Sequence, residues 1–195
     1  MRLMQRSFTF HLLNACAILF LYPPPLLLFD VASLDKGKGM PLEGMQLGRY
    51  RLLRLFGSGA MGEVYLAEDI RISQQVAIKI LRIETSSETD DPSVKEAVRL
   101  FQREAMTIAK LDHPNILPLY DYGEVDSDGL RLTYLVMPLR PEGSLAKWLV
   151  QRGKSTQLSP QDAAHFISQA ASALQHAHDH DVVHQDVKPS NFLIR

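Results

Sequence analysis

The chain has a single cysteine, Cys16, in 195 residues, so no internal disulfide can form. That composition excludes a disulfide-stabilised scaffold and fits a reducing compartment. An excess of charge of one sign is also absent, since the formal net charge is −1. A near-neutral chain gives no support for nucleic acid as a partner. The chain has no internal repeat, and its 46% hydrophobic residues suit one globular domain or two small lobes.

A long membrane-spanning run is missing as well, although residues 1–45 are more apolar than the rest. An apolar stretch from Phe8 to Tyr22 is followed by Pro23-Pro24-Pro25 and by a second, shorter apolar stretch at 26–29. As a helix, the first stretch would reach about 24 Å, which is short of the roughly 30 Å hydrocarbon core of a bilayer. The three prolines would then end the helix.

We therefore interpret residues 1–45 as a hydrophobic extension and linker outside the working domain, with Met40 or Met45 as the true start. This interpretation predicts a cytoplasmic protein. The alternative is a signal peptide or membrane anchor, in which residues 8–29 alone would contact a membrane.

The most informative stretch combines three closely spaced glycines with a lysine on a following strand. The run Gly57-Ser58-Gly59-Ala60-Met61-Gly62 lets the backbone turn tightly and approach a phosphate. Apolar residues on both sides, Val64 among them, predict a strand, a turn and a second strand. Residues 76–81 predict a third strand, in which alternation places Ala77 and Lys79 on one face. A lysine in so apolar a run needs an anion, and a phosphate under the glycine turn would serve.

A glutamate on the next helix is the expected partner of that lysine. Ser93-Val94-Lys95-Glu96 matches a capping box and predicts the start of the helix. Its apolar stripe contains Ala97, Phe101 and Ile108, and Glu104 falls on the same stripe. A carboxylate that faces a core needs a cation, so we expect an ion pair with Lys79. The alternative is a glutamate that reaches solvent from the edge of the stripe.

Two further elements are expected downstream. Residues 116–122 and 130–137 predict a β-hairpin. A helix is predicted after Ser159, which has the properties of an N-cap, with Pro160 in the first turn. The residues expected on its buried face are Phe166, Ile167, Ala170, Leu174 and Ala177.

Several histidines crowd the end of that helix, and three of them share one helical face: His176, His180 and His184. We interpret them as imidazoles favoured near a helix C-terminus rather than as a metal site, because no cysteine or suitably placed glutamate completes a ligand set. If the position of Asp181, just after the helix, is left-handed, aspartate is tolerated there at a cost of about 1 kcal/mol.

In this order and spacing, the stretches resemble the bacterial-type, eukaryotic-like serine/threonine protein kinases. The glycine turn and Val76-Ala77-Ile78-Lys79 resemble the family's glycine-rich loop and third-strand lysine, and residues 137–145 resemble its hinge. The strongest match is His184-Gln185-Asp186-Val187-Lys188-Pro189-Ser190-Asn191, which resembles the catalytic loop with Gln185 in place of arginine.

The resemblance covers residues 50–195 and implies a protein-kinase-like α+β fold. It implies a complete N-lobe over residues 50–137, made of an antiparallel sheet and one helix, a hinge at 138–143 and a partial helical C-lobe at 144–195.

The resemblance also implies transfer of the γ-phosphate of ATP to serine or threonine hydroxyls of a protein substrate, with Mg²⁺ as the metal. Asp186 would orient the substrate hydroxyl and accept its proton, Lys188 would face the transferring phosphate, and Asn191 would bind magnesium. The remaining residues that the resemblance assigns to ATP binding are Gly57, Ser58, Gly59, Ala60, Met61, Gly62, Val64, Ala77, Lys79, Glu104, Met137, Pro138 and Arg140.

Within the hinge, Met137 would be the gatekeeper, the carbonyl of Pro138 would contact adenine, and the N–H of Arg140 would donate to it. Gln185 in the position of the family's arginine implies that regulation does not rely on a phosphorylated loop docked on that residue.

The family's Asp-Phe-Gly segment, which carries its main magnesium ligand, does not occur in residues 1–195. We therefore expect little or no phosphotransfer from these residues alone, and exposed apolar side chains on the helix at 160–180. One alternative is an ATP-binding pseudokinase or interaction module without catalysis, and a weaker one is a membrane-tethered sensor that uses residues 8–29. The sequence does not identify the substrate protein.

Overall fold

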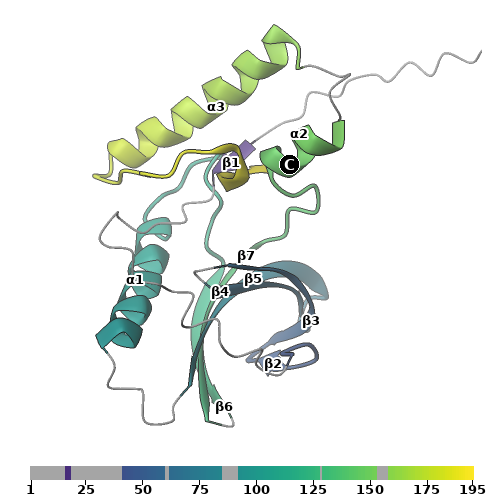
Figure 1. The fold of residues 1–195 in the computed structure, drawn as a ribbon, viewed down its shortest axis with the longest axis vertical. Coiled ribbons are helices and arrows are strands. Elements are labelled where there is room, and N and C mark those ends of the chain that lie inside the picture. Colours follow the sequence, from purple (N-terminus) through teal and green to yellow (C-terminus); the bar gives the residue numbers. More distant parts are fainter. Residues whose placement is uncertain (1–15, 19–40, 60–61, 85–91, 128, 153–157) are drawn as a thin grey trace, which may run out of the picture.

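The computed structural model describes residues 16–18, 41–59, 62–84, 92–127, 129–152 and 158–195 (Figure 1). Its larger sheet has six antiparallel strands in the order β2-β3-β4-β5-β7-β6. These strands are β2 (Gln46–Leu47), β3 (Tyr50–Gly59), β4 (Gly62–Asp69), β5 (Gln74–Glu84), β6 (Asp121–Ser127) and β7 (Leu130–Pro138).

The two faces of β5 pack in two different hydrophobic clusters, as the alternation predicts. Val76, Ile78 and Ile80 belong to the cluster inside the curved sheet. Ala77 belongs to a second cluster, which includes Phe101 of helix α1 (Pro92–Ile108). The strand extends beyond the predicted residues 76–81 because its polar ends also find partners, Gln74 opposite Asp69 and Glu84 opposite Leu130.

Three boundaries differ from the sequence prediction. Helix α1 begins at Pro92, so Ser93 lies inside it and the predicted N-cap is wrong. Proline suits the first helical turn because its fixed φ is already helical and its missing N–H is not needed there. The first strand of the predicted hairpin begins at Asp121 instead of residue 116. The core also starts earlier than residue 50, since Leu42 and Leu47 are buried against the sheet.

Beyond the sheet, the chain forms helices α2 (Leu145–Arg152) and α3 (Pro160–His178), a 3₁₀ turn η2 (Pro189–Asn191) and strand β8 (Phe192–Ile194). Ser159 caps α3 as predicted, because its hydroxyl accepts a hydrogen bond of 3.0 Å from the N–H of Asp162. The predicted burial of Ile167 is wrong, since this residue is 68% exposed. Ala173, which was not predicted, is completely buried instead.

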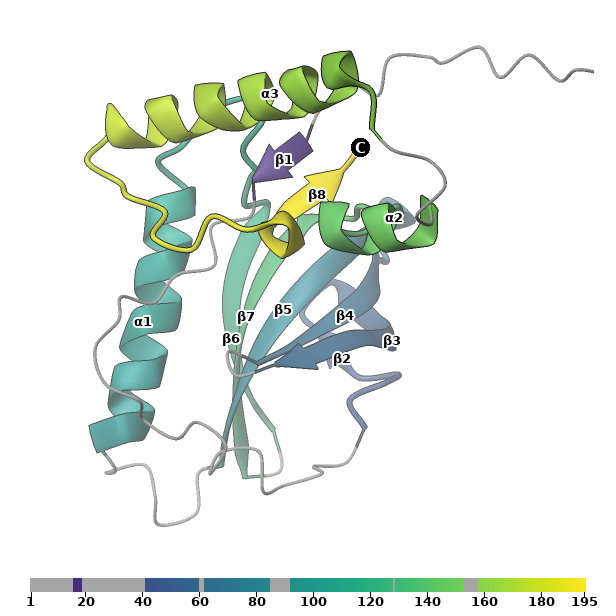
Figure 2. The same ribbon diagram turned by 45° about the horizontal axis from the view of Figure 1, so that its top comes forward.

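A second, two-stranded sheet joins the two ends of the described chain. Strand β1 (Cys16–Ile18) pairs antiparallel with β8, and Figure 2 shows the two strands side by side beneath α3. The helical conformation considered for residues 7–22 is therefore wrong at 16–18, and the rest of that segment lies outside the described residues. No helix in the described ranges is long and apolar enough to cross a membrane.

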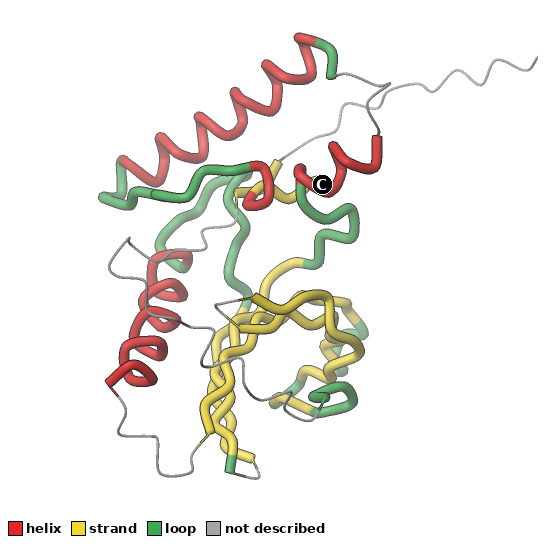
Figure 3. The backbone as a smooth tube through the Cα atoms, in the orientation of Figure 1, coloured by secondary structure: helices red, strands yellow, loops and turns green. Residues whose placement is uncertain are grey.

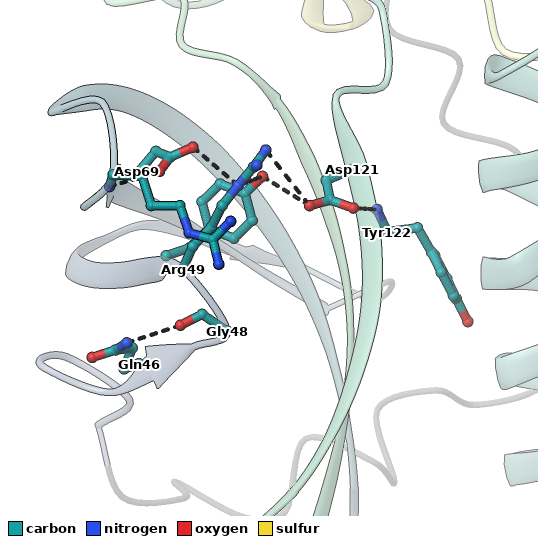
Figure 4. A network of polar contacts seen from close by, with 8 residues as sticks. Gln46, Gly48, Arg49, Asp69, Asp121 and Tyr122 are labelled. Atoms are coloured by element: carbon teal, nitrogen blue, oxygen red, sulfur yellow. Dashed lines mark hydrogen bonds and ion pairs between the residues drawn. The ribbon is translucent and has the colours of Figure 1, made fainter.

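A polar network ties three strands together at the end of the β3–β4 hairpin opposite the glycine turn (Figure 4). The Arg49 guanidinium contacts the buried Asp69 at 3.0 Å and Asp121 at 3.8 Å. The hydroxyl of Tyr50 donates to Asp121 at 2.9 Å, and burial raises the pKa of Tyr50 to about 12. A cavity of about 260 Å³ opens beside this network. It lies away from the predicted site, because Asp69 and the glycine turn are at opposite ends of β4.

Candidate active site

The glycine turn connects β3 and β4 and lies close to the backbone of β5. Gly57 faces Val64 and Gly59 faces Gly62 across the hairpin. Gly62 has a φ of 109°, and a Cβ added to it would lie 2.2 Å from the carbonyl oxygen of Ile80. Only glycine fits such a conformation and such a close approach. The predicted residues Ala60 and Met61 lie outside the described residues.

The predicted ion pair between Lys79 and Glu104 is present in the structure. The Lys79 ammonium donates to both carboxylate oxygens of Glu104, at 3.0 and 2.8 Å. The two side chains are only 4% and 2% exposed. The Lys79 Nζ also lies 5.4 Å from the centre of the Phe101 ring, which adds a cation–π contact. Glu104 therefore does not reach solvent from the edge of the helix, which was the alternative interpretation.

The charge of Lys79 opposes the effect of burial on Glu104, and the pair leaves one Lys79 donor for an anion. Burial raises the pKa of the Glu104 carboxyl, and the charge of Lys79 and its hydrogen bonds partly offset that increase. An ammonium group has three donors, of which Glu104 accepts two. The pair thus holds a cationic donor at a fixed position on β5, where Val64 lies directly opposite Lys79.

The hinge continues from the last strand of the sheet. Met137 is 6% exposed and lies opposite Ala77, while Pro138 lies opposite Val76. The last pair between β6 and β7 is Asp121 with Val136, and Pro138 comes after it. Proline is therefore tolerated here, because β6 needs no hydrogen bond from a backbone N–H at position 138. The carbonyl of Arg140 accepts from the N–H of Gly143 at 3.1 Å.

One residue that the sequence reasoning missed is Leu193. It packs against the cluster that contains Ala77 and Met137, which Val64 and Leu139 also contact. Its neighbours on β8, Phe192 and Ile194, belong to the other core cluster, near α3. The sequence did contain a signal for Leu193. Side chains alternate along a strand, so Leu193 must point to the face opposite that of Phe192 and Ile194.

The predicted catalytic residues lie together in the loop between α3 and η2 and in η2 itself (Figure 3). The Lys188 ammonium contacts the Asp186 carboxylate at 2.7 Å. The Asn191 side-chain amide donates to the Asp186 carbonyl at 2.8 Å and to its carboxylate at 3.1 Å. The Lys188 hydrogen bond, followed by the Asn191 hydrogen bond, lowers the pKa of Asp186, although partial burial opposes the shift.

Two left-handed residues shape this loop. Asp181 has a φ of 60°, and Gln185 has a φ of 58°. His184 is buried between them, and its Nδ1 accepts from the backbone N–H of Asp186 at 3.2 Å. That bond orients the backbone immediately before the Asp186 carboxylate.

Strand β8 connects the predicted catalytic loop with the cluster beside Lys79. Asn191 immediately precedes this strand, and Leu193 packs on the cluster that lies beside Lys79. The Asn191 amide nitrogen donates to Asp186, so its Oδ1 remains as a hard oxygen of the kind that Mg²⁺ prefers. The chemistry of Asn191 therefore suits its predicted role.

The histidines at the end of α3 pack against one another. The rings of His176 and His180 lie 4.4 Å apart, and His180 Nδ1 contacts the carbonyl of His176 at 2.8 Å. The third neighbour is His113, whose ring centre is 5.2 Å from that of His176. Among the described residues, no group of three or more histidine, cysteine, aspartate or glutamate side chains is arranged to hold a metal.

Comparison with known proteins matches residues 50–195 to the protein kinase domain family. The serine/threonine-protein kinase PrkC of Bacillus subtilis is 42% identical over 147 residues, which are 75% of this chain and 21% of PrkC. The serine/threonine-protein kinase PknA of Mycobacterium tuberculosis is 44% identical over 156 residues, 79% of this chain and 34% of PknA. The chain thus spans a fifth to a third of these relatives.

A solved structure gives the same result for the fold. The crystal structure of the Mycobacterium tuberculosis PknI kinase domain matches with a TM-score of 0.58 and 31% identity, over 76% of this chain and 55% of that domain. The expected kinase-like fold, with an antiparallel sheet and a partial helical lobe, is therefore confirmed. The chain belongs to the protein kinase domain family, among the bacterial serine/threonine kinases.

Proposed function

We propose that this protein transfers the γ-phosphate of ATP to serine or threonine hydroxyls of another protein. The observation that carries the proposal is the buried Lys79–Glu104 pair beside the glycine turn. Burying two charges is costly, and a stripe of apolar residues would pack more simply. A cation held by a carboxylate beside the glycine turn is useful when a phosphate binds there.

We assign the adenine site to the hinge and the cluster beside it. Apolar side chains from both lobes enclose this place, with Val64 and Ala77 on one side and Leu193 on the other. Within the described residues, the Arg140 N–H has no hydrogen-bond partner, so it is available to adenine. Pro138 contributes only its carbonyl, which is the group the family uses at that position.

The residues of the catalytic loop would act on the substrate hydroxyl. Asp186 accepts the hydroxyl proton as the hydroxyl oxygen attacks the γ-phosphorus, and the bond to the β-phosphate oxygen breaks to release ADP. Lys188 lies close enough to Asp186 to reach the same phosphoryl group. Magnesium, held by Asn191, would neutralise phosphate charge during transfer. Because cellular ATP is the proposed substrate, we place the protein in the cytoplasm.

The test combines a binding assay with a transfer assay. We expect Mg²⁺-ATP to raise the melting temperature of the protein and Lys79→Met to abolish that rise. The transfer assay uses a protein that also contains an Asp-Phe-Gly segment, because we expect little transfer from residues 1–195 alone. With a generic protein substrate and radiolabelled ATP, Asp186→Asn should reduce its transfer by about 10²- to 10⁴-fold. The matched control is Asp126→Asn, at the exposed tip of the β6–β7 hairpin, where the carboxylate pairs only with Arg131.

Two outcomes would overturn the proposal. Stabilisation by ATP that survives Lys79→Met would show that the nucleotide does not use this site. Binding without transfer in a protein that also contains an Asp-Phe-Gly segment would identify an ATP-binding module and exclude an enzyme.

A further inference from the structure

Polar side chains hold the segment that follows α1 against α3 (Figure 1). His113 Nε2 lies 3.0 Å from the Ser172 hydroxyl, and the Asn115 side-chain amide donates to the Gln169 side-chain oxygen at 3.1 Å. Gln169, Ser172 and His176 are three or four residues apart, so they lie along one face of α3. The segment is therefore held by neutral polar groups and imidazoles.

The contacts of His113 determine which of its ring nitrogens carries the proton. Its Nδ1 accepts a hydrogen bond of 3.1 Å from the backbone N–H of Asn115. A neutral imidazole that accepts at Nδ1 has its proton on Nε2, which then donates to Ser172. A second proton would turn Nδ1 into a donor that faces another donor. Protonation of His113 therefore breaks a hydrogen bond within the segment.

Two further imidazoles lie beside His113. The centre of the His176 ring is 5.2 Å from that of His113 and 4.4 Å from that of His180. His176 Nε2 is buried and has no hydrogen-bond partner in the part of the chain that the structure describes. A proton added to His113 thus places a positive charge beside a second imidazole.

The charged residues around the rings do not compensate such a charge. Lys110 and Asp112, on the same segment, are both exposed. Asp179 bonds to a glutamine of its own helix instead. Among the described residues, neither carboxylate forms an ion pair with a histidine. Burial, followed by the charge of His176, accordingly lowers the pKa of His113 below its ordinary value of 6.5.

We propose that His113, His176 and His180 form a pH-sensitive contact, the histidine latch, between the segment after α1 and helix α3. With neutral rings the latch is closed. When His113 takes up a proton, the segment separates from α3, because the bond from Asn115 is lost and the charged ring lies against its neighbour. The inference goes beyond phosphate transfer, and its tests need no nucleotide, so its failure would be distinguishable from failure of the proposed function.

The latch would act on the active site through α1. Ile108, the last residue of this helix, packs in the same cluster as Leu111 and Phe166. Glu104, which pairs with Lys79, lies one turn before Ile108. Opening of the latch would therefore remove support from the end of the helix that carries Glu104.

The first test follows the His113 ring of the full chain by NMR as the pH is lowered. Its titration midpoint should lie below 6.5. His176→Gln removes the neighbouring charge, so the midpoint of His113 should rise in this variant. The matched control, His178→Gln, changes an exposed histidine of the same helix and should leave the midpoint unchanged. A midpoint at or above 6.5 in the unmodified protein, or the same midpoint in His176→Gln, would overturn the latch.

The second test measures opening of the segment by amide exchange at Ile116, whose N–H donates to the His113 carbonyl at 3.0 Å. Rates are divided by those of an unstructured peptide, because exchange itself depends on pH. Opening that takes up one proton should become up to about tenfold more frequent between pH 7.5 and pH 5.5. His113→Gln should lose this dependence, and His178→Gln should retain it.

Two results of the exchange measurement would contradict the latch. A pH dependence that persists in His113→Gln would show that another group controls the opening. Exchange at Ile116 as slow as that of the buried Ile78 at every pH would show that the segment opens only when the whole domain unfolds.

Discussion

Replacing Lys79 by methionine tests the centre of the site through its effect on stability. The substitution removes the ammonium that contacts both oxygens of Glu104 and leaves a carboxyl with 2% exposure. Removing one partner of a buried ion pair typically destabilises a protein by about 3–5 kcal/mol. We expect the destabilisation by Lys79→Met to reach that range near pH 8 if Glu104 stays ionised. Proton uptake by Glu104 would make the destabilisation smaller.

Proton uptake by Glu104 makes the loss of stability in Lys79→Met depend on pH. The environment of Glu104 determines the direction of this dependence. Burial already raises the pKa of Glu104 above its ordinary value of 4.5, and loss of the lysine charge raises it further. The folded protein then holds this proton where the unfolded protein has released it. The stability that this proton contributes to Lys79→Met is therefore fully present below pH 4.5, and it is lost as the pH rises through the pKa of Glu104 in the folded protein.

Urea denaturation at several pH values would measure this effect. The free energy of unfolding of Lys79→Met should fall with increasing pH, by up to about 1.4 kcal/mol per pH unit. The double variant Lys79→Met/Glu104→Gln is the control, because it has no carboxyl at this position to titrate. A loss below about 1 kcal/mol at pH 8, or a loss equal at pH 6 and pH 8, would refute a buried and mutually dependent pair.

Three further predictions concern other parts of the chain. Gly62→Ala should destabilise the protein by more than about 1 kcal/mol and weaken ATP binding, whereas Gly57→Ala, whose added Cβ meets nothing within 4 Å, should not destabilise it in a thermal assay. Ser159→Ala should cost about 0.5–2 kcal/mol in urea denaturation, and Ser159→Asp should restore most of it. Burial and the nearby His176 lower the pKa of His113, so the free energy of unfolding should fall as the pH drops through 6.5. His113→Gln should show a smaller fall, and an unchanged fall would exclude His113 as its source.

The sequence was sufficient to predict features that depend on neighbouring residues. Alternation along β5 placed Lys79 on the face toward α1, and helical spacing placed Glu104 on the stripe that faces back. Each pattern is set by backbone geometry over a few residues, which is why both were readable without a structure. The cap at Ser159 was predictable for the same reason.

Features that depend on distant segments were not predictable. Ile167 is apolar and correctly spaced, but which part of a broad apolar arc is covered depends on what packs against the helix. In this structure the covered part includes Ala173, which is small enough for close packing. The pairing of β1 with β8 joins residues from opposite ends of the chain, and no local pattern specifies which strand edge an apolar segment will meet.

Strand β8 shows why so short an element can connect the two halves of the site. Three residues cannot form a stable strand alone, and even a two-stranded ribbon is marginal in water. Its stability must therefore come from the Ser144 side, from β1 and from the two clusters that receive its alternating side chains. Leu193, beside the proposed adenine site, and Asn191, the proposed magnesium ligand, lie only two residues apart along the chain. One short strand therefore positions both of them.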